Sequence, residues 1–314
     1  MTQTKNWYSN EVSLLETSNQ EVNASLVQRL LFKVARRWVS GNTYKNALSI
    51  AKECNSKGIS AILNYLGEDT TDNTIIENTI EEYLSLLDKI QSNRIEGCIS
   101  VKPTQVGLRI SYDMSLNNFR KIARKAKSLG RFMWMDIESS QFVEDTIATY
   151  LDLSRDYKHS TGLAIQSYLR RSSSDLLHLI EQEANVRLVK GAYREDKTSA
   201  FQSMEKINSN FSKLMSMLFE HSYSSHSTFA IATHDPKLLD EAIQLSRKYD
   251  ADCRKFEFQL LMGIHNEMKE KLVKKGFRVS EYIPYGKLWL PYSLRRIKER
   301  KRNILLLARS IIQS

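Results

Sequence analysis

The segment Phe132-Met-Trp-Met-Asp-Ile-Glu138 is a short apolar run that ends in two carboxylates. It is one of eight such runs after Gly58, and a strand is the element that runs of this length and composition favour. The eight runs are Ile59–Leu66, Cys98–Val101, Phe132–Ile137, Leu163–Ile165, Val186–Val189, Phe229–Ala232, Phe256–Leu261 and Val279–Ile283. Strands that alternate with helices predict a parallel sheet with right-handed crossovers, and eight such units in about 250 residues match a (β/α)₈ barrel.

The segments between these runs have a helical period. The clearest are Leu116–Leu129, Phe142–Tyr157, Asn208–Glu220 and Pro236–Lys248. A doubly wound sheet is the main alternative, but no G-x-G-x-x-G or G-x-x-x-x-G-K-[ST] loop follows any of the runs. We therefore expect a helical segment over residues 1–58 and one (β/α)₈ catalytic domain over residues 59–314, together forming a single structural domain.

The chain of 314 residues carries 46 Lys and Arg against 36 Asp and Glu, a net charge of +10. The basic residues are dispersed and no nucleic-acid motif is present, so an anionic substrate or membrane surface explains the charge better than nucleic acid does. The three cysteines have neither disulfide nor zinc spacing, which is typical of a reducing compartment. The longest apolar run, Ile304–Ala308, is too short to span a bilayer.

Polar residues follow nearly all of the runs. In a barrel of this kind the carboxyl ends of the strands form the active site. Period two places Trp134, Asp136 and Glu138 on one face of the third strand and the neighbouring methionines on the other, so Asp136 is expected to face the mouth of the barrel. The other polar strand ends are Lys102–Gln105, Gln166–Tyr168, Lys190–Tyr193, Thr233–Asp235, Glu257–Gln259 and Tyr282.

Arg187 lies within a strand, where a charge needs a buried partner or an anionic ligand. An ion pair with Asp136 or Glu257 is the structural alternative to a ligand. Gly191 and Ala192 are small, so a planar ligand could approach the backbone there.

Lys102 and His234 each allow more than one chemistry. Lys102 could form a Schiff base, as in a barrel aldolase, or it could act as a positive charge. His234 could be a base, a metal ligand or a cofactor contact, but no second histidine stands at ligand spacing and no metal is expected.

The late segment Tyr282-Ile-Pro-Tyr-Gly-Lys-Leu-Trp-Leu-Pro-Tyr-Ser-Leu-Arg295-Arg296-Ile-Lys-Glu299-Arg300 predicts a strand, a turn and a helix opened by Pro291. Spacings of three and four put Tyr292, Arg295, Arg296 and Glu299 on one face of that helix. Two adjacent guanidinium groups are suited to clamping a carboxylate or phosphate.

Several motifs, in combination and in order, resemble those of the proline dehydrogenase family, in its short monofunctional bacterial and archaeal form. They are Ser100-Val-Lys102, Trp134-Met-Asp136-Ile-Glu138, Arg187-Leu-Val-Lys-Gly-Ala-Tyr193, Ala232-Thr-His-Asp235, Phe256-Glu-Phe-Gln259 and the late segment above. The likeness extends loosely over residues 20 to 310. It departs from the family at Pro103 and over 196–210, where relatives hold the adenine-side phosphates of FAD.

The resemblance implies a (β/α)₈ barrel that carries FAD and oxidises L-proline to Δ1-pyrroline-5-carboxylate by transfer of a hydride from proline C5 to flavin N5. It implies that Arg295 and Arg296 grip the proline carboxylate, with Glu299 orienting an arginine and Lys102 adding positive charge. The remaining substrate residues that it implies are Asp136, Leu261, Tyr282 and Tyr292. The residues that it implies for the flavin are Gln166, Arg187, Lys190, Gly191, Ala192, Tyr193, Thr233 and His234.

The same resemblance implies a quinone as electron acceptor and a cytoplasmic protein with peripheral contact to the inner face of the membrane. The segment 302–312 could serve as an interfacial helix or pack as the end of the last helix. Two alternatives stay open: a Schiff-base aldolase that uses Lys102, and a basic protein without chemistry that binds nucleic acid or membrane. The electron acceptor, the range of proline analogues and the oligomeric state are undetermined by the sequence.

Overall fold

The computed structural model describes residues 35–222 and 227–298. The chain divides into two compact units, one over Trp38–Leu288 and one that joins Met1–Arg37 to Trp289–Ser314. The first unit contains all the strands described below. Of the second, residues 35–37 and the helix α11 (Trp289–Lys298) are described.

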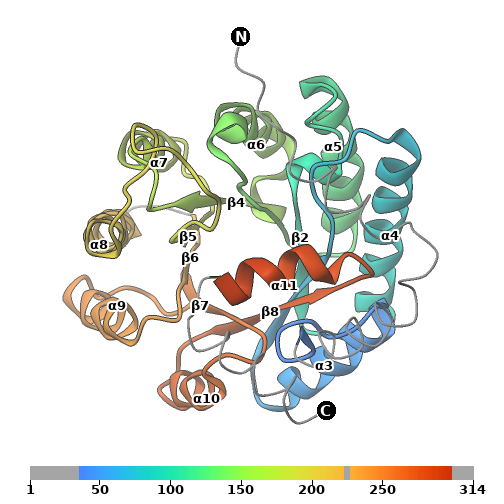
Figure 1. The fold of residues 1–314 in the computed structure, drawn as a ribbon. Helices are drawn as coiled ribbons and strands as arrows, with labels where there is room; N and C mark the ends of the chain where they lie inside the picture. Colours follow the sequence, from blue (N-terminus) through green and yellow to red (C-terminus); the bar gives the residue numbers. More distant parts are fainter. Residues whose placement is uncertain (1–34, 223–226, 299–314) are drawn as a thin grey trace, which may run out of the picture. The chain divides into compact units, whose positions relative to one another are not determined.

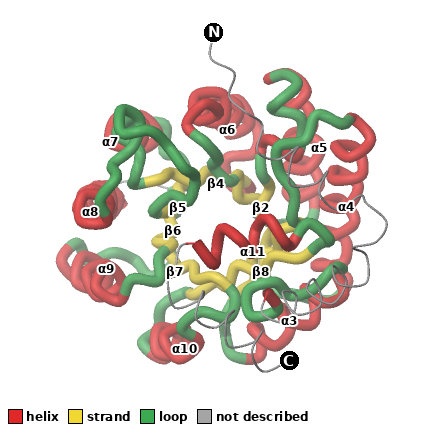
Figure 2. The backbone as a smooth tube through the Cα atoms, in the orientation of Figure 1, coloured by secondary structure: helices red, strands yellow, loops and turns green. Residues whose placement is uncertain are grey.

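The first unit is a closed barrel of parallel strands in sequence order, with β1 paired to β8 (Figures 1 and 2). The strands are β1 (Ser60–Tyr65), β2 (Gly97–Val101), β3 (Met133–Met135), β4 (Thr161–Gln166), β5 (Val186–Val189), β6 (Phe229–Ala232), β7 (Phe256–Leu261) and β8 (Val279–Tyr285). Each coincides with one of the eight apolar runs. The predicted (β/α)₈ fold is therefore confirmed.

Helices surround the barrel (Figure 2). They are α3 (Tyr44–Ser56), α4 (Asn73–Ser92), α5 (Tyr112–Ser128), α6 (Val143–Tyr157), α7 (Ser172–Glu181), α8 (Met204–Ser222), α9 (Pro236–Lys248) and α10 (Asn266–Lys274). Of these, α3 precedes β1, and α4 to α10 follow β1 to β7 in turn. Short 3₁₀ helices occupy η1 (Pro103–Gln105), η2 (Ser140–Phe142) and η3 (Lys158–Ser160). The expected helical segment 1–58 includes α3, but residues 1–34 lie outside the described part, so the boundary at 58 stays a prediction.

Local sequence explains where several helices begin. Asp72 accepts hydrogen bonds from the backbone N–H groups of Thr74 (2.8 Å) and Ile75 (3.2 Å) and so caps α4. Asp235 caps α9 through the N–H of Lys237, and Pro236 occupies the first helical position, where no backbone donor is needed. These caps end the loops that follow β1 and β6 and thereby fix their length.

The alternation of β3 sorts its side chains between two cores. Met133 and Met135 pack outward into the large cluster between barrel and helices, whereas Trp134 packs inward with Ile62 and Ala230. Trp134 pairs in register with Gly162 of β4, where a Cβ would collide with the indole ring. The interior can therefore hold a tryptophan because the neighbouring strand contributes no side chain at that level.

Candidate active site

Asp136 follows β3 at the mouth of the barrel, the end at which the carboxyl ends of the strands meet. Its Oδ1 accepts from Ser100 Oγ (2.6 Å) and Arg187 Nη1 (2.7 Å). Its Oδ2 accepts from Lys102 Nζ (3.1 Å) and Tyr282 OH (2.8 Å). Four donors from β2, β5, β8 and the loop after β2 thus converge on one carboxylate that is 7% exposed.

The electrostatics of this cluster keep Asp136 ionised. Burial alone raises the pKa of its carboxyl group, but the charges of Lys102 and Arg187 and the bonds from Ser100 and Tyr282 outweigh burial and lower the pKa to about 2. One carboxylate faces two cations, so the cluster around Asp136 carries a surplus of positive charge. Such a surplus suits an anionic ligand.

Arg187 reaches this position because its neighbours are small. Ala164 of β4 and Ala230 of β6 pair with it in register and leave the interior to the guanidinium group. That group lies 4.6 Å from the ring centroid of Trp134 and 5.7 Å from that of Tyr282. The ion pair with Asp136 that the sequence allowed is present, so the alternative with Glu257 is not needed.

Two further donors of Arg187 are left over. Its Nε and Nη2 are buried and find no acceptor among the described residues. A buried donor without an acceptor costs about 1–3 kcal/mol, and more when it is charged. Arg187 therefore combines both expectations: one nitrogen pairs with Asp136, and two remain for a ligand.

The loop after β5 brings the backbone close to an aromatic ring. Gly191 has φ +108°, and a Cβ there would collide with the ring of Tyr168. Lys190 Nζ lies 2.9 Å from Asp235 Oδ2 and so joins the ends of β5 and β6. Tyr193 donates through its OH to Glu68 at 3.1 Å, across to the loop after β1. Ala192 lies between Gly191 and Tyr193 in the sequence of this loop.

The ends of β4, β6 and β7 add polar groups. Gln166 is buried at the end of β4; its Nε2 donates to Ile137 O at 3.4 Å, and its Oε1 has no donor within the described part of the chain. His234 Nε2 accepts from the backbone N–H of Leu261 at 3.3 Å, which ties the end of β6 to that of β7. Thr233 Oγ1 accepts from the N–H of Asp235.

The expected carboxylate clamp falls on the second unit. Tyr292, Arg295 and Arg296 lie in α11, as the spacing predicted. The side chains of the two arginines and all of Glu299 lie outside what the structure describes. The clamp therefore stays a prediction.

Sequence reasoning named Ser100 and Asp235 only within motifs and strand ends and assigned neither of them a role in the site. Ser100 stands two residues before Lys102, so the alternation of β2 could have placed both on the inward face. Asp235 could have been found as the cap before Pro236.

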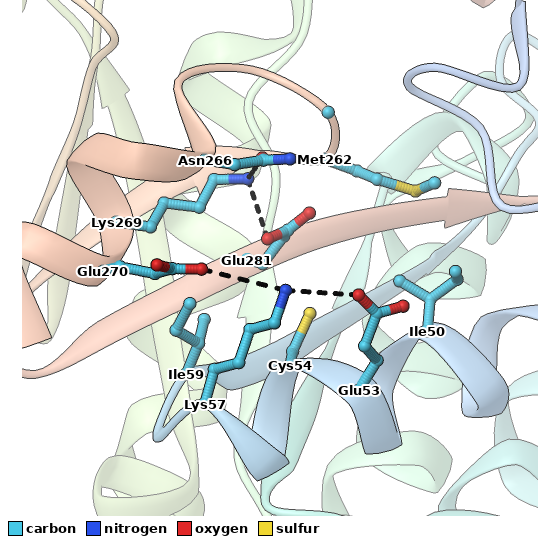
Figure 3. A pocket seen from close by; sticks show the side chains of 11 residues that line it. Ile50, Glu53, Cys54, Lys57, Ile59, Met262, Asn266, Lys269, Glu270 and Glu281 are labelled. Atoms are coloured by element: carbon cyan, nitrogen blue, oxygen red, sulfur yellow. Dashed lines mark hydrogen bonds and ion pairs between the residues drawn. The ribbon is translucent and has the colours of Figure 1, made fainter.

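A separate cavity of about 150 Å³ lies outside the barrel, between α3, α10 and β8 (Figure 3). Lys269 and Glu281 form a buried ion pair in it at 2.7 Å, and Lys57 lies between Glu53 and Glu270. Burial, followed by the charge of Glu281, raises the pKa of the Cys54 thiol to about 12. The charged side chains that line this cavity are paired with one another, and the Cys54 thiol is protonated at neutral pH. The cavity therefore lacks the surplus of positive charge found around Asp136.

Comparison with known proteins agrees with this geometry. The family model described as proline dehydrogenase matches residues 47–307. This chain belongs to the proline dehydrogenase family. The resemblance seen in its motifs is thereby confirmed, as is the expectation of an L-proline dehydrogenase, an oxidoreductase of proline metabolism.

Individual relatives cover nearly the whole chain. Proline dehydrogenase 1 of Bacillus subtilis (strain 168) is 31% identical over 280 residues, 89% of this chain and 91% of that protein. Proline dehydrogenase of Deinococcus radiodurans is 29% identical over 292 residues, 92% of this chain and 93% of that protein. Membership of the family sets aside a basic protein without chemistry.

A solved structure shares the fold. Proline utilization A (PutA) from Bdellovibrio bacteriovorus, inactivated by N-propargylglycine, superposes with a TM-score of 0.81 at 22% identity. The match covers 90% of this chain and 35% of that one. At this identity the likeness supports the barrel alone.

Two properties bear on cofactors and membranes. Over residues 35–222 and 227–298, no cluster of three or more His, Cys, Asp or Glu side chains is arranged to hold a metal ion. None of the described helices has the length and apolar character that crossing a bilayer requires.

Proposed function

We propose that this chain oxidises L-proline to Δ1-pyrroline-5-carboxylate with bound FAD. The observation that carries the proposal is the convergence of Lys102, Arg187 and Tyr282 on Asp136 at the mouth of a barrel of this family. This cluster offers positive charge to a small carboxylate and unused donors to a second ligand. A zwitterionic amino acid and a flavin fit those two needs.

Lys102 and the helix α11 would bind the substrate. Arg295 and Arg296 would grip the proline carboxylate, because a planar guanidinium group can donate two parallel hydrogen bonds to it. Glu299 would orient one of these arginines. Tyr282, Tyr292 and Leu261 would enclose the ring, while Asp136 would hold Lys102 and Tyr282 in place.

The residues around Arg187 fit a flavin. Its Nε and Nη2 are donors that need acceptors, and the Oε1 of Gln166 is an acceptor that needs a donor. An isoalloxazine ring offers both on one edge. Gly191, with no side chain, lets the backbone come close to a flat group. Lys190, Ala192, Tyr193, Thr233 and His234 would complete the contacts to FAD.

When bound, FAD supplies the redox chemistry by accepting at N5 the hydride that leaves proline C5. The protein contributes position: a clamped carboxylate and an enclosed ring hold C5 in one orientation, which makes the transfer effectively unimolecular. The secondary amine must also lose its proton. Solvent can take that proton, so no strong base is required of the side chains.

The state of Lys102 favours this reaction over a Schiff-base aldolase. Its Nζ lies 3.1 Å from the carboxylate of Asp136, whose pKa is about 2. An ammonium group held against a carboxylate is a stable charge and a poor nucleophile. Borohydride in the presence of a carbonyl substrate should therefore leave no covalent adduct on Lys102; an adduct found by mass spectrometry would favour the aldolase.

The electrons would pass from the reduced flavin to a quinone. A cytoplasmic protein with peripheral contact to the inner face of the membrane is consistent with the net charge of +10. Binding to anionic vesicles that weakens with salt would support this part, and equal binding to neutral vesicles would contradict it.

A visible spectrum of the purified full-length protein tests the proposal. We expect flavin absorption that bleaches without oxygen when L-proline is added. D-proline is the matched control, because a clamp that holds the carboxylate turns its ring to the other side. Protein that takes up no flavin, or flavin that L-proline does not bleach, would contradict the proposal.

A further inference from the structure

Glu138 is a second buried carboxylate at the mouth of the barrel, two residues beyond Asp136. It is 3% exposed, and both of its oxygens are engaged by Thr104. Glu138 Oε2 accepts from the backbone N–H of Thr104 and Oε1 accepts from its hydroxyl group, each at 2.8 Å. A buried carboxylate held at both oxygens by one residue fixes that residue in place.

The residue held in this way belongs to the loop that carries Lys102. Thr104 lies in η1, which starts directly after Lys102 and begins with Pro103. Gln105 N donates to Lys102 O at 3.1 Å, and Gln105 Nε2 donates to Tyr65 O at 2.8 Å. The loop is short and internally bonded, so a shift at Thr104 moves Lys102.

The same hydroxyl group also reaches the loop after β1. Thr104 Oγ1 accepts from the backbone N–H of Asp69 at 2.7 Å. Asp69 in turn pairs with Arg109, which lies after η1, at 2.6 Å. The contacts of Glu138 therefore connect the loops that follow β1, β2 and β3.

We propose that Glu138 is a positioning residue, which holds Lys102 in place through Thr104 and weakens that hold when its carboxyl group takes up a proton. The proposal deepens the proposed function and rests on it, because that function has Lys102 add positive charge for the proline carboxylate beside Arg295 and Arg296. Glu138 would act through Thr104 and would not touch the substrate.

The charges around Glu138 set the pH at which this happens. Burial is the largest influence and raises its pKa; Glu68, after β1, raises it further. Lys102, after β2, and the two bonds from Thr104 lower it, and the resulting pKa is about 7. Asp136, with a pKa of about 2, stays ionised throughout this range. The two carboxylates after β3 thus differ in charge state near neutral pH.

Protonation changes what Glu138 can accept. An ionised carboxylate accepts from both the N–H and the hydroxyl group of Thr104, whereas a neutral carboxylic acid has one good acceptor oxygen. One of the two bonds therefore weakens as the pH falls below about 7. The loss of a negative charge near Lys102 would by itself favour a bound carboxylate, so the rise in KM for proline that we expect comes from the weaker positioning of Lys102.

The test is the pH profile of steady-state proline oxidation by the flavin-loaded full-length enzyme with a dye as electron acceptor. In the wild type we expect kcat/KM to fall below an inflection near pH 7 toward a plateau about tenfold lower, the level set by the neutral side chain. In Glu138→Gln we expect this inflection to disappear. At pH 8 the KM of this variant should exceed that of the wild type by about tenfold, the loss of one charge-assisted hydrogen bond.

Two variants at Thr104 separate positioning from general destabilisation. Thr104→Val removes the hydroxyl group and should raise KM at pH 8 with little change in kcat. Thr104→Ser restores the hydroxyl group and should bring KM back toward the wild-type value. If Glu138→Gln loses its flavin, this Val and Ser pair still decides the question.

Glu82→Gln is the matched control. The carboxyl group of Glu82 also accepts a hydrogen bond at 2.8 Å, from Tyr285 OH, but it lies on α4. The pH profile of the Glu82→Gln variant should match that of the wild type. A wild-type KM and inflection in Glu138→Gln, or an unchanged KM in Thr104→Val, would overturn the proposal. Wild-type enzyme that does not oxidise proline at all would instead contradict the proposed function.

Discussion

Arg187 and Asp136 form a buried ion pair inside the barrel, with 2.7 Å between Nη1 and Oδ1 and side chains 4% and 10% exposed. The pair joins β5 to the end of β3 and is bracketed by Lys102 and Tyr282. The ion pair links two strands of the barrel. It also belongs to the candidate site, because it orients the remaining nitrogens of Arg187.

Removing the charge of Asp136 should destabilise the protein. In Asp136→Asn, Arg187 and Lys102 lose their shared carboxylate, and breaking a buried pair on one side costs about 3–5 kcal/mol. Denaturant unfolding of the flavin-free protein measures the loss. Asp252→Asn is the control, since its partner Arg254 is largely exposed and the pair contributes little. Equal stability of the two variants would mean that the buried network carries no energy.

The same carboxylate predicts an acid dependence of stability. Its pKa is about 2 in the folded protein against an ordinary value of 3.8. Since the folded pKa is depressed, its stabilisation is present in full above about pH 4 and is lost as the pH falls through about 2. The difference in unfolding free energy between wild type and Asp136→Asn should shrink by roughly 2 kcal/mol over that window. A difference that stays constant with pH would show that the proton is not taken up there.

Gly191 should be intolerant of a side chain for a reason other than its backbone angle. Gly191→Ala forces either Tyr168 or the loop 190–193 to move, which should lower the flavin content of the purified protein. Gly276→Ala is a matched control: that glycine also has positive φ, +84°, but has nothing within 4 Å of an added Cβ. The ratio of flavin absorbance to protein concentration measures the flavin content of both variants. Equal flavin content would remove the loop after β5 from the proposed cofactor site.

The arginine pair should be sensitive to loss of its planar groups. Arg295→Lys and Arg296→Lys should each raise the KM for proline by about tenfold or more, because a lysine cannot donate two parallel bonds to a carboxylate. The control is Arg247→Lys on α9, an exposed position far along the chain from the pair. Steady-state kinetics decide, and an unchanged KM in both variants would remove the clamp.

Much of the site could be foreseen residue by residue. The alternation of β3 placed Asp136 inward, and the cost of an unpaired charge within a strand predicted a partner or ligand for Arg187. The choice between Asp136 and Glu257 as that partner was open, because strand periodicity orients a side chain without saying how far along the barrel its tip reaches. The small neighbours Ala164 and Ala230 decide that reach.

Glu138 was visible in the sequence only as a polar strand end. Its pairing with Thr104 depends on the relative height of the loops after β2 and β3, and its raised pKa depends on burial by residues distant in the sequence. Neither the pairing with Thr104 nor the raised pKa can be recognised from the residues that neighbour Glu138 in the sequence.

The sequence by itself determined the fold class, because eight short apolar runs separated by helical segments have few other ways to bury their surface. It also determined which residue types stand at the strand ends. The tertiary structure alone decided which of them meet: a carboxylate shared by two cations, a second held neutral or charged near pH 7, and an arginine with two donors to spare. Those outcomes are set by distances and burial between strands, and such quantities exist only once the barrel has closed.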